Sequence, residues 1–317
     1  MNYFKKYFVH VLVGLLIFSI LILSLLVIGE KSLNKKEGVV VEIPNAFKEI
    51  NLEAKSALVW DVVNNKELFS KNPNEPLPLA SLTKVMTAIT TDGKLSDGEE
   101  VKITAEDLLP EGDSGLVVGD TWRAKDLRDF TLLTSSNDGA LALAAVAESE
   151  QIVPPYTSNA GASPEELRTQ FIKSMNAIAA KIGLSNSKFF NENGLDVSAD
   201  KGGAYGSAKD MAILFEYTLK NYPQILEATR YKNLEFKSNK ETYFAENTNN
   251  IIDKIPDIIA SKTGYTDLAG GNLVVAFDAG LNHPIIISIL GSTQEGRFTD
   301  VLQLVEASMK YINQNDN

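Results

Sequence analysis

Residues 79–88 read Leu79-Ala80-Ser81-Leu82-Thr83-Lys84-Val85-Met86-Thr87-Ala88, and they predict a buried helix that opens on a serine and a lysine. Pro76 and Pro78 end any strand before it, and the apolar residues that follow Lys84 recur at the spacing of a buried helix, which we expect to end near Gly93. Residues three apart on a helix share a face. The Ser81 hydroxyl and the Lys84 amine are therefore expected to be neighbours in the first turn.

This pair suits nucleophilic catalysis, because a serine hydroxyl needs a neighbouring base to take its proton. The chain has only two histidines, His10 in an apolar run and His283 in a predicted turn, which argues against a Ser-His-Asp triad. The absence of cysteine excludes thiol catalysis and cysteine-ligated zinc. Lysine is then the most plausible base. The plain alternative is an ordinary helix start, because Ser-x-x-Lys also occurs at 32–35 and 185–188.

Composition narrows the class of protein. The chain has 317 residues, of which 44% are hydrophobic and 22% are charged, which is typical of a globular protein with a sizeable core. The formal net charge of −11 argues against nucleic acid as a partner, since phosphate binding needs a basic surface. Without cysteine, no disulfide braces the fold.

The N-terminus predicts a membrane anchor. Residues 7–28 carry no Asp, Glu, Lys or Arg and are long enough to cross a bilayer, whereas a cleavable signal peptide usually has a shorter apolar region. We expect a tail at 1–6, an uncleaved transmembrane signal anchor at 7–28, a linker at 29–50 and a catalytic domain at 51–317. A cleaved signal or a buried core helix are the alternatives.

The remaining pattern predicts an α+β fold. Strands are expected at 57–63 and 66–69, near 116–118, at 234–237, 242–244, 272–279 and 284–290. Helices are expected at 124–134, 138–147, 163–182, 207–220, 223–229 and 297–314, with N-terminal caps at Ser163 and Ser207. Strands at both ends with helices between them indicate an antiparallel sheet built from both chain ends and an inserted helical lobe.

Two further motifs carry polar side chains. Ser135-Ser136-Asn137-Asp138 lies between two predicted helices, and either it aims into a cleft or Asn137 or Asp138 simply caps the second helix. Lys262-Thr263-Gly264 precedes a predicted strand, and it is either a functional segment beside the sheet or a charged turn entering an edge strand. Taken alone, each of these motifs is weak evidence for an active site.

In combination and in this order, the three motifs resemble those of penicillin-binding proteins and serine β-lactamases. More narrowly, the residues in and around these motifs resemble those of the D-alanyl-D-alanine carboxypeptidases, the low-molecular-mass penicillin-binding proteins. The resemblance covers about residue 57 to the C-terminus and rests on 79–88, 135–138, Asn193 to Asp196, and Lys262-Thr263-Gly264-Tyr265-Thr266-Asp267 with Ala269-Gly270 and Asn272-Leu273.

The resemblance implies roles in acyl transfer. Ser81 would be the acylated nucleophile and Lys84 its base, which must be neutral for that role. Burial and the nearby Lys262 ammonium would both lower the Lys84 pKa. Ser135 would relay a proton to the leaving amine, and Asn137 would hold the substrate amide.

The same resemblance implies a binding site for the substrate. The backbone N–H groups of the nucleophile and of Tyr265 would form an oxyanion hole. Lys262, Thr263 and Gly264 would border the substrate, the first two facing its terminal carboxylate. Arg297 would bind the same carboxylate, although an arginine near a helix start is often only a solvated charge. The resemblance implies neither a metal nor a cofactor.

These roles imply a serine D-Ala-D-Ala carboxypeptidase outside the cytoplasmic membrane, held there by a single pass of residues 7–28. It would trim peptidoglycan stem peptides and be inhibited covalently by β-lactams. Many members carry a further β-rich domain and a C-terminal anchor, whereas we expect this chain to be anchored at its N-terminus. A β-lactamase is disfavoured, because Glu165-Glu166-Leu167-Arg168 lacks a Glu-x-x-Leu-Asn-like element. An endopeptidase on the same scaffold and a β-lactam sensor remain alternatives.

Overall fold

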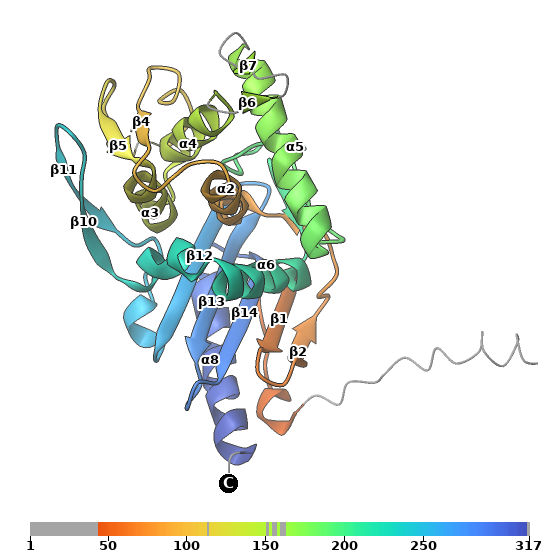
Figure 1. Cartoon of the computed structure of the whole chain (residues 1–317). Helices are drawn as coiled ribbons and strands as arrows, with labels where there is room; N and C mark the ends of the chain where they lie inside the picture. Colours follow the sequence, from red (N-terminus) through yellow and green to blue (C-terminus); the bar gives the residue numbers. More distant parts are fainter. Residues whose placement is uncertain (1–43, 113, 150–151, 154–156, 159–162, 316–317) are drawn as a thin grey trace, which may run out of the picture. The chain divides into compact units, whose positions relative to one another are not determined.

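The structure is a computed structural model that describes residues 44–112, 114–149, 152–153, 157–158 and 163–315 (Figure 1). The predicted anchor at 7–28 lies outside these residues, as does most of the predicted linker. None of the helices in the described part of the chain is long and apolar enough to span a bilayer.

A five-stranded antiparallel sheet lies at the centre of the fold and confirms the predicted α+β class. Its order is β12-β13-β14-β1-β2. The strands are β1 (Ser56–Asp61), β2 (Lys66–Lys71), β12 (Ile258–Thr266), β13 (Gly270–Asp278) and β14 (Pro284–Ser292). Strand β1 pairs with β14, so the two ends of the chain meet inside one sheet, as predicted.

Side chains that alternate along each strand pack on opposite faces of the sheet. Leu273 and Val275 of β13 face the C-terminal helix α8 (Gly296–Asn315), whose Val301 and Leu304 are fully buried there. Val274 of the same strand faces the helical lobe instead. Both faces are therefore covered, α8 lying on one and the lobe on the other (Figure 1).

The helical lobe confirms the predicted block of helices. Its members are α2 (Thr83–Asp92), α3 (Ala124–Thr134), α4 (Asn137–Ser149), α5 (Pro164–Ile182), α6 (Ala208–Asn221) and α7 (Pro223–Leu226). Two predicted caps are confirmed: Ser163 forms a capping box with Glu166 at the start of α5, and Ser207 accepts a hydrogen bond from the Asp210 amide at the start of α6.

Short elements connect these layers. The strands predicted at 234–237 and 242–244 are confirmed as β10 (Asn233–Lys237) and β11 (Thr242–Glu246), which pair as a hairpin. The other short strands are β3 (Leu77–Pro78), β4 (Glu100–Lys102), β5 (Thr121–Arg123), β6 (Ile152–Val153), β7 (Thr157–Ser158), β8 (Lys188–Phe189) and β9 (Ala204–Gly206). The 3₁₀ turns are η1 (Asn45–Phe47), η2 (Ala80–Leu82), η3 (Glu227–Arg230) and η4 (Ile252–Lys254).

Two parts of the sheet structure differ from the sequence-based expectation. The strand expected near 116–118 is wrong: the segment is irregular, with positive φ at Gly115 and Gly119, and the flanking β4 and β5 pair with each other instead. Lys262-Thr263-Gly264 precedes β13, as predicted, but the segment itself lies within another strand, β12, which was not predicted.

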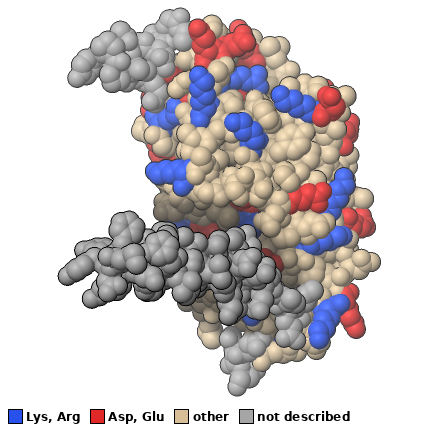
Figure 2. Space-filling model, turned by 90° about the vertical axis from the view of Figure 1, so that its right-hand side faces the viewer, with Lys and Arg blue, Asp and Glu red and all other residues tan. Residues whose placement is uncertain are grey.

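Packed structure also begins before residue 51. The Phe47 side chain is 1% exposed and stacks on Phe69 of β2 at a ring distance of 5.9 Å. On the surface seen in Figure 2, basic and acidic side chains are interspersed, and neither sign gathers into one patch.

Candidate active site

Ser81 lies in a tightly held turn before α2. Ala80 has a φ of 49°, which is rare for a residue with a side chain and costs backbone strain. The turn is held on two sides: the Leu79 amide donates to the Ala204 carbonyl, and the Asn272 side chain donates to the Leu79 carbonyl at 3.0 Å. This anchoring leaves Ser81 half-buried, whereas the following residues of α2 are buried.

Lys84 is fully buried and points at the serine, as the helical spacing predicts. Its Nζ donates to Ser81 Oγ at 2.8 Å, to Asn137 Oδ1 at 2.7 Å and to the Asn193 carbonyl at 2.7 Å. Burial lowers the Lys84 pKa to about 7, and the carboxylates of Glu192 and Asp138 oppose that shift. A substantial fraction of neutral amine is therefore present at neutral pH.

The expected effect of burial on the Lys84 pKa is confirmed, but Lys262 is not among its causes. Instead, Lys84 affects Lys262: the Lys262 pKa is lowered first by its own burial and then by the charges of Lys84 and Arg297.

Ser135 and Lys262 face each other across the site. Ser135 is the C-cap of α3 and adopts a left-handed backbone conformation with φ of 64°. Lys262 Nζ donates to Ser135 Oγ at 2.9 Å and to the Thr263 carbonyl at 3.0 Å. The lysine of β12 thus positions a hydroxyl that arrives from the helical lobe.

The predicted cap at Asn137 or Asp138 is wrong. Ser136 caps α4, because its Oγ accepts the Gly139 amide at 2.9 Å. The Asn137 side chain is then left for the site: its Oδ1 accepts from Lys84, and its Nδ2 donates to the Glu111 carbonyl at 2.6 Å. The reading of this tetrad as a polar loop directed at the site is supported by these contacts.

Strand β12 borders the Ser81 turn closely. A Cβ on Gly264 would stand 2.9 Å from the Leu79 carbonyl oxygen and 3.1 Å from the Ser81 amide nitrogen, so only glycine fits without a shift. Next to it, Thr263 is buried and its Oγ1 bonds Thr248 Oγ1 at 2.5 Å, whereas Tyr265 is 44% exposed.

Arg297 is not a solvated charge. It lies in the first turn of α8, is 7% exposed and donates from Nη1 to the Gly264 carbonyl at 2.8 Å. Its Nε has no hydrogen-bond partner among the described residues. Burial lowers its pKa, yet a guanidinium remains charged. Arg297 therefore brings a fixed positive charge to the end of the Lys262-Thr263-Gly264 segment.

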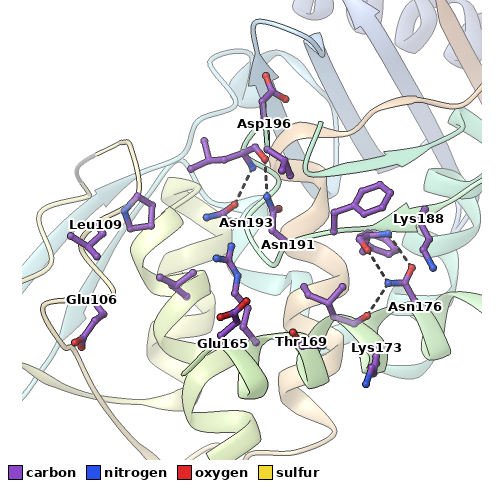
Figure 3. Close-up of a pocket in the computed structure, with 18 residues that line it drawn as sticks. Glu106, Leu109, Glu165, Thr169, Lys173, Asn176, Lys188, Asn191, Asn193 and Asp196 are labelled. Atoms are coloured by element: carbon purple, nitrogen blue, oxygen red, sulfur yellow. Dashed lines mark hydrogen bonds between the residues drawn. The ribbon is translucent and has the colours of Figure 1, made fainter. Parts of the chain in front are cut away.

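A hollow of about 980 Å³ lies between α5 and residues 188–197. Figure 3 shows side chains of α5, among them Glu165, Thr169 and Lys173, on one side and Asn193 and Asp196 on another. Its lining does not include Ser81 or Lys262. It shares Asn193 with the site, since the carbonyl of that residue accepts from Lys84. The hollow is a neighbour of the site and not the site itself.

A model of the D-alanyl-D-alanine carboxypeptidase family matches residues 43–294. The chain belongs to this family. It is 30% identical over 267 residues to the D-alanyl-D-alanine carboxypeptidase DacF of Bacillus subtilis, covering 81% of the chain and 62% of DacF. It is 27% identical to the carboxypeptidase DacC of Escherichia coli, covering 82% and 62%. The chain thus spans about three fifths of the length of these relatives.

Solved structures of similar proteins support membership of this family. Penicillin-binding protein D2 of Listeria monocytogenes, solved in an ampicillin-bound form, is 26% identical, with a TM-score of 0.68 over 82% of this chain and 98% of that one. A mutant of the Streptomyces K15 DD-transpeptidase gives a TM-score of 0.71 at 22% identity, over 82% and 99%, which shows a shared fold.

The structure brings Ser81, Lys84 and Asn137 into contact, and it pairs Ser135 with Lys262 and Arg297 with the Gly264 carbonyl. Thr263 and Tyr265 lie on the same strand, where Thr263 contacts Thr248 instead. The structure also adds partners that the sequence did not reveal. The Asn193 carbonyl was not predicted as an acceptor for Lys84, although its Asn-Gly-Leu-Asp stretch was noted. A backbone carbonyl carries no side-chain signal, so only the fold identifies it. Glu192, whose carboxylate acts on the Lys84 pKa, pairs with Arg168 of α5 at 3.0 Å. The sequence does not indicate this pair, because an ion pair between separate segments has no characteristic spacing.

Proposed function

We propose that this chain is a serine D-Ala-D-Ala carboxypeptidase that removes the terminal D-alanine from peptidoglycan stem peptides. The observation that carries the proposal is the 2.8 Å hydrogen bond between Lys84 Nζ and Ser81 Oγ, formed by a buried amine with a pKa of about 7. A base with a pKa near the working pH is effective in general base catalysis.

In the proposed reaction, Lys84 takes the Ser81 proton and Oγ attacks the carbonyl carbon between the two D-alanines. The C–N bond then breaks, and the leaving amine receives a proton through Ser135, which Lys262 orients. Water hydrolyses the resulting ester and restores the serine. Asn137 Nδ2, now bonded to Glu111, lies beside the reacting pair and is proposed to bind the substrate amide.

The backbone amides of Ser81 and Tyr265 are proposed to bind the oxyanion. The close approach of Gly264 to the Ser81 amide supports this arrangement, because the two chain segments lie within contact distance. Lys262 and Thr263 of β12 supply an amine and a hydroxyl, and Arg297 of α8 brings a guanidinium to the Gly264 carbonyl of the same strand, which suits the terminal carboxylate of the substrate.

The test measures D-alanine released from a D-Ala-D-Ala-terminated pentapeptide by the full-length chain in detergent. We expect release by the wild type and none by Ser81→Ala. Absence of release by a folded wild-type protein would contradict the proposal.

A second candidate is endopeptidase activity on cross-linked peptides. It is favoured by a relative in Pseudomonas aeruginosa named D-alanyl-D-alanine endopeptidase, which is 30% identical over 230 residues. Incubation with a cross-linked dimer beside the pentapeptide separates the two, because only an endopeptidase releases both monomers from the dimer.

Two further features belong to the proposal. β-Lactams are proposed to acylate Ser81, which is supported by the ampicillin-bound form of the Listeria relative. Residues 7–28 are proposed to anchor the chain in the cell membrane with the catalytic domain outside the cytoplasm, supported by their uncharged length. Membrane fractionation of chains with and without residues 7–28 tests this anchor. We expect only the chain that includes residues 7–28 to sediment with membranes.

A further inference from the structure

An ion pair lies directly behind the lysine that is proposed as the base. Glu192 has a fully buried side chain, and its two carboxylate oxygens accept from Nε and Nη2 of Arg168, each at 3.0 Å. This is the two-pronged geometry that makes arginine–carboxylate pairs strong and directional. Arg168 comes from α5 and is half-exposed, so the pair joins α5 to the segment between β8 and β9.

The segment that carries Glu192 runs along α2, and its successive residues contact successive turns at the start of that helix. The Glu192 carbonyl accepts from Thr87 Oγ1 at 2.5 Å, and the next carbonyl, that of Asn193, accepts from Lys84 at 2.7 Å. At the next residue, a Cβ on Gly194 would stand 1.9 Å from the Ala80 carbonyl oxygen. Three consecutive residues therefore fit against the helix that carries the base.

The charges around Lys84 come from three elements. Glu192 faces it from the 190–196 segment and Asp138 from α4, and both favour its charged form. Lys262 lies on β12, and its own pKa responds to the Lys84 charge. Asp138 is held by the Ser114 hydroxyl at 2.8 Å, so of the two carboxylates only Glu192 is paired to a cation in the described part of the chain.

We propose that Arg168 and Glu192 are positioning residues of the active site: the pair holds the Asn193 carbonyl against Lys84, and the Glu192 carboxylate sets how readily Lys84 gives up its proton. This inference rests on the proposed function, because it concerns the base of that reaction. Neither residue touches the substrate in this account.

The proposal makes opposite predictions for the two partners. Glu192→Gln removes the carboxylate that favours charged Lys84, so the acid limb of the rate profile moves to lower pH. Arg168→Gln leaves that carboxylate without its counter-charge, so the limb moves to higher pH. We expect the ratio of kcat/KM at pH 6 to that at pH 8 to rise at least about twofold in the first variant and to fall at least about twofold in the second.

Further variants separate this effect from a loss of structure. Arg168→Lys keeps the charge, and we expect it to keep the wild-type pH profile. The double variant Arg168→Gln with Glu192→Gln removes both charges of the pair and leaves neither without its counter-charge, so it is the fallback if a single variant does not fold. Its pH profile is expected to follow that of Glu192→Gln. Glu216→Gln is the matched control, since Glu216 is paired with Lys220 on α6 and is not among the groups acting on Lys84.

A second readout does not depend on the substrate. The Lys84 Nζ titration is followed by NMR of the full-length chain with ¹³Cε-labelled lysine, assigned with Lys84→Arg. Titration midpoints that move in opposite directions in the two single variants support the proposal, even if no peptide is hydrolysed. Coincident midpoints, or shifts in the same direction, would overturn it, whereas loss of peptide hydrolysis with shifted midpoints would count only against the proposed function.

Discussion

Lys84 is the residue on which the proposed chemistry depends, because that chemistry needs a neutral amine next to the serine, and the buried Lys84 Nζ lies 2.8 Å from Ser81 Oγ. Burial lowers its pKa to about 7, so the amine is protonated below that pH and free above it. The acylation of Ser81 should therefore slow by about tenfold per pH unit below pH 7. We would measure the second-order rate of labelling by a fluorescent penicillin from pH 5 to 9, and a flat profile would count against lysine as the base.

Arg297 is the second residue with a separable role. Arg297→Gln removes a fixed cation whose Nη1 donates to the Gly264 carbonyl, and the step that it should affect is the proposed recognition of the terminal carboxylate. We expect kcat/KM for the D-Ala-D-Ala peptide to fall by about 10- to 100-fold, with the larger part in KM. The control substrate is the same peptide with a C-terminal amide. An equal loss on both peptides would argue against carboxylate recognition.

Among the elements, the 190–196 segment packs directly against α2 and the turn before it, because Gly194 has no side chain that would hold the two apart. Gly194→Ala combines a φ of 85° with a Cβ placed 1.9 Å from the Ala80 carbonyl oxygen. We expect it to lower the free energy of unfolding by about 2–4 kcal/mol and to slow acylation, since the Asn193 carbonyl must move.

Gly183→Ala is the control for this prediction. Gly183 has the same φ of 85° at the end of α5, but no atom lies within 4 Å of an added Cβ. This substitution should lower the free energy of unfolding by about 1–2 kcal/mol through backbone strain alone, and it should leave the rate of acylation unchanged. Equal effects of the two substitutions in urea unfolding and in labelling would show that contact with Ala80 is unimportant.

Elements with strong local signals were predictable from the sequence. The capping box at Ser163 and the cap at Ser207 indicate the starts of α5 and α6. β12 was not recognised, because its polar Ser-Lys-Thr-Gly core lacks the alternation of a half-buried strand, and its pairing with β13 is a property of the whole sheet. The choice of Ser136 over Asn137 as a cap likewise depends on Lys84, a distant residue.

At the scale of the whole molecule, Asp300 joins the two ends of the chain. This buried carboxylate of α8 accepts from the amides of Glu53 and Ala54, just before β1, and from the Ser292 hydroxyl at the end of β14. Asp300→Ala would leave these donors unpaired, so we expect a loss of about 2–4 kcal/mol in the free energy of unfolding.

The measurement for Asp300→Ala is urea denaturation followed by both tryptophan fluorescence and penicillin labelling. Because both chain ends form one sheet, the two signals should be lost together. The control is Asp200→Ala, which removes an exposed carboxylate that accepts a hydrogen bond from the Ser198 hydroxyl, and it should leave the free energy of unfolding nearly unchanged. If penicillin labelling persisted at urea concentrations beyond the fluorescence transition, the domain would not unfold as a single cooperative unit.

The proposed mechanism requires that Ser81, activated by Lys84, forms an acyl-enzyme. Its most direct test is mass spectrometry of the full-length chain after brief exposure to a penicillin, followed by peptide mapping. We expect one adduct of the full mass of the penicillin on the peptide that contains Ser81. It should form in the wild type, form much more slowly in Lys84→Met and be absent in Ser81→Ala. An adduct on another residue, or one that persists in Ser81→Ala, would contradict it.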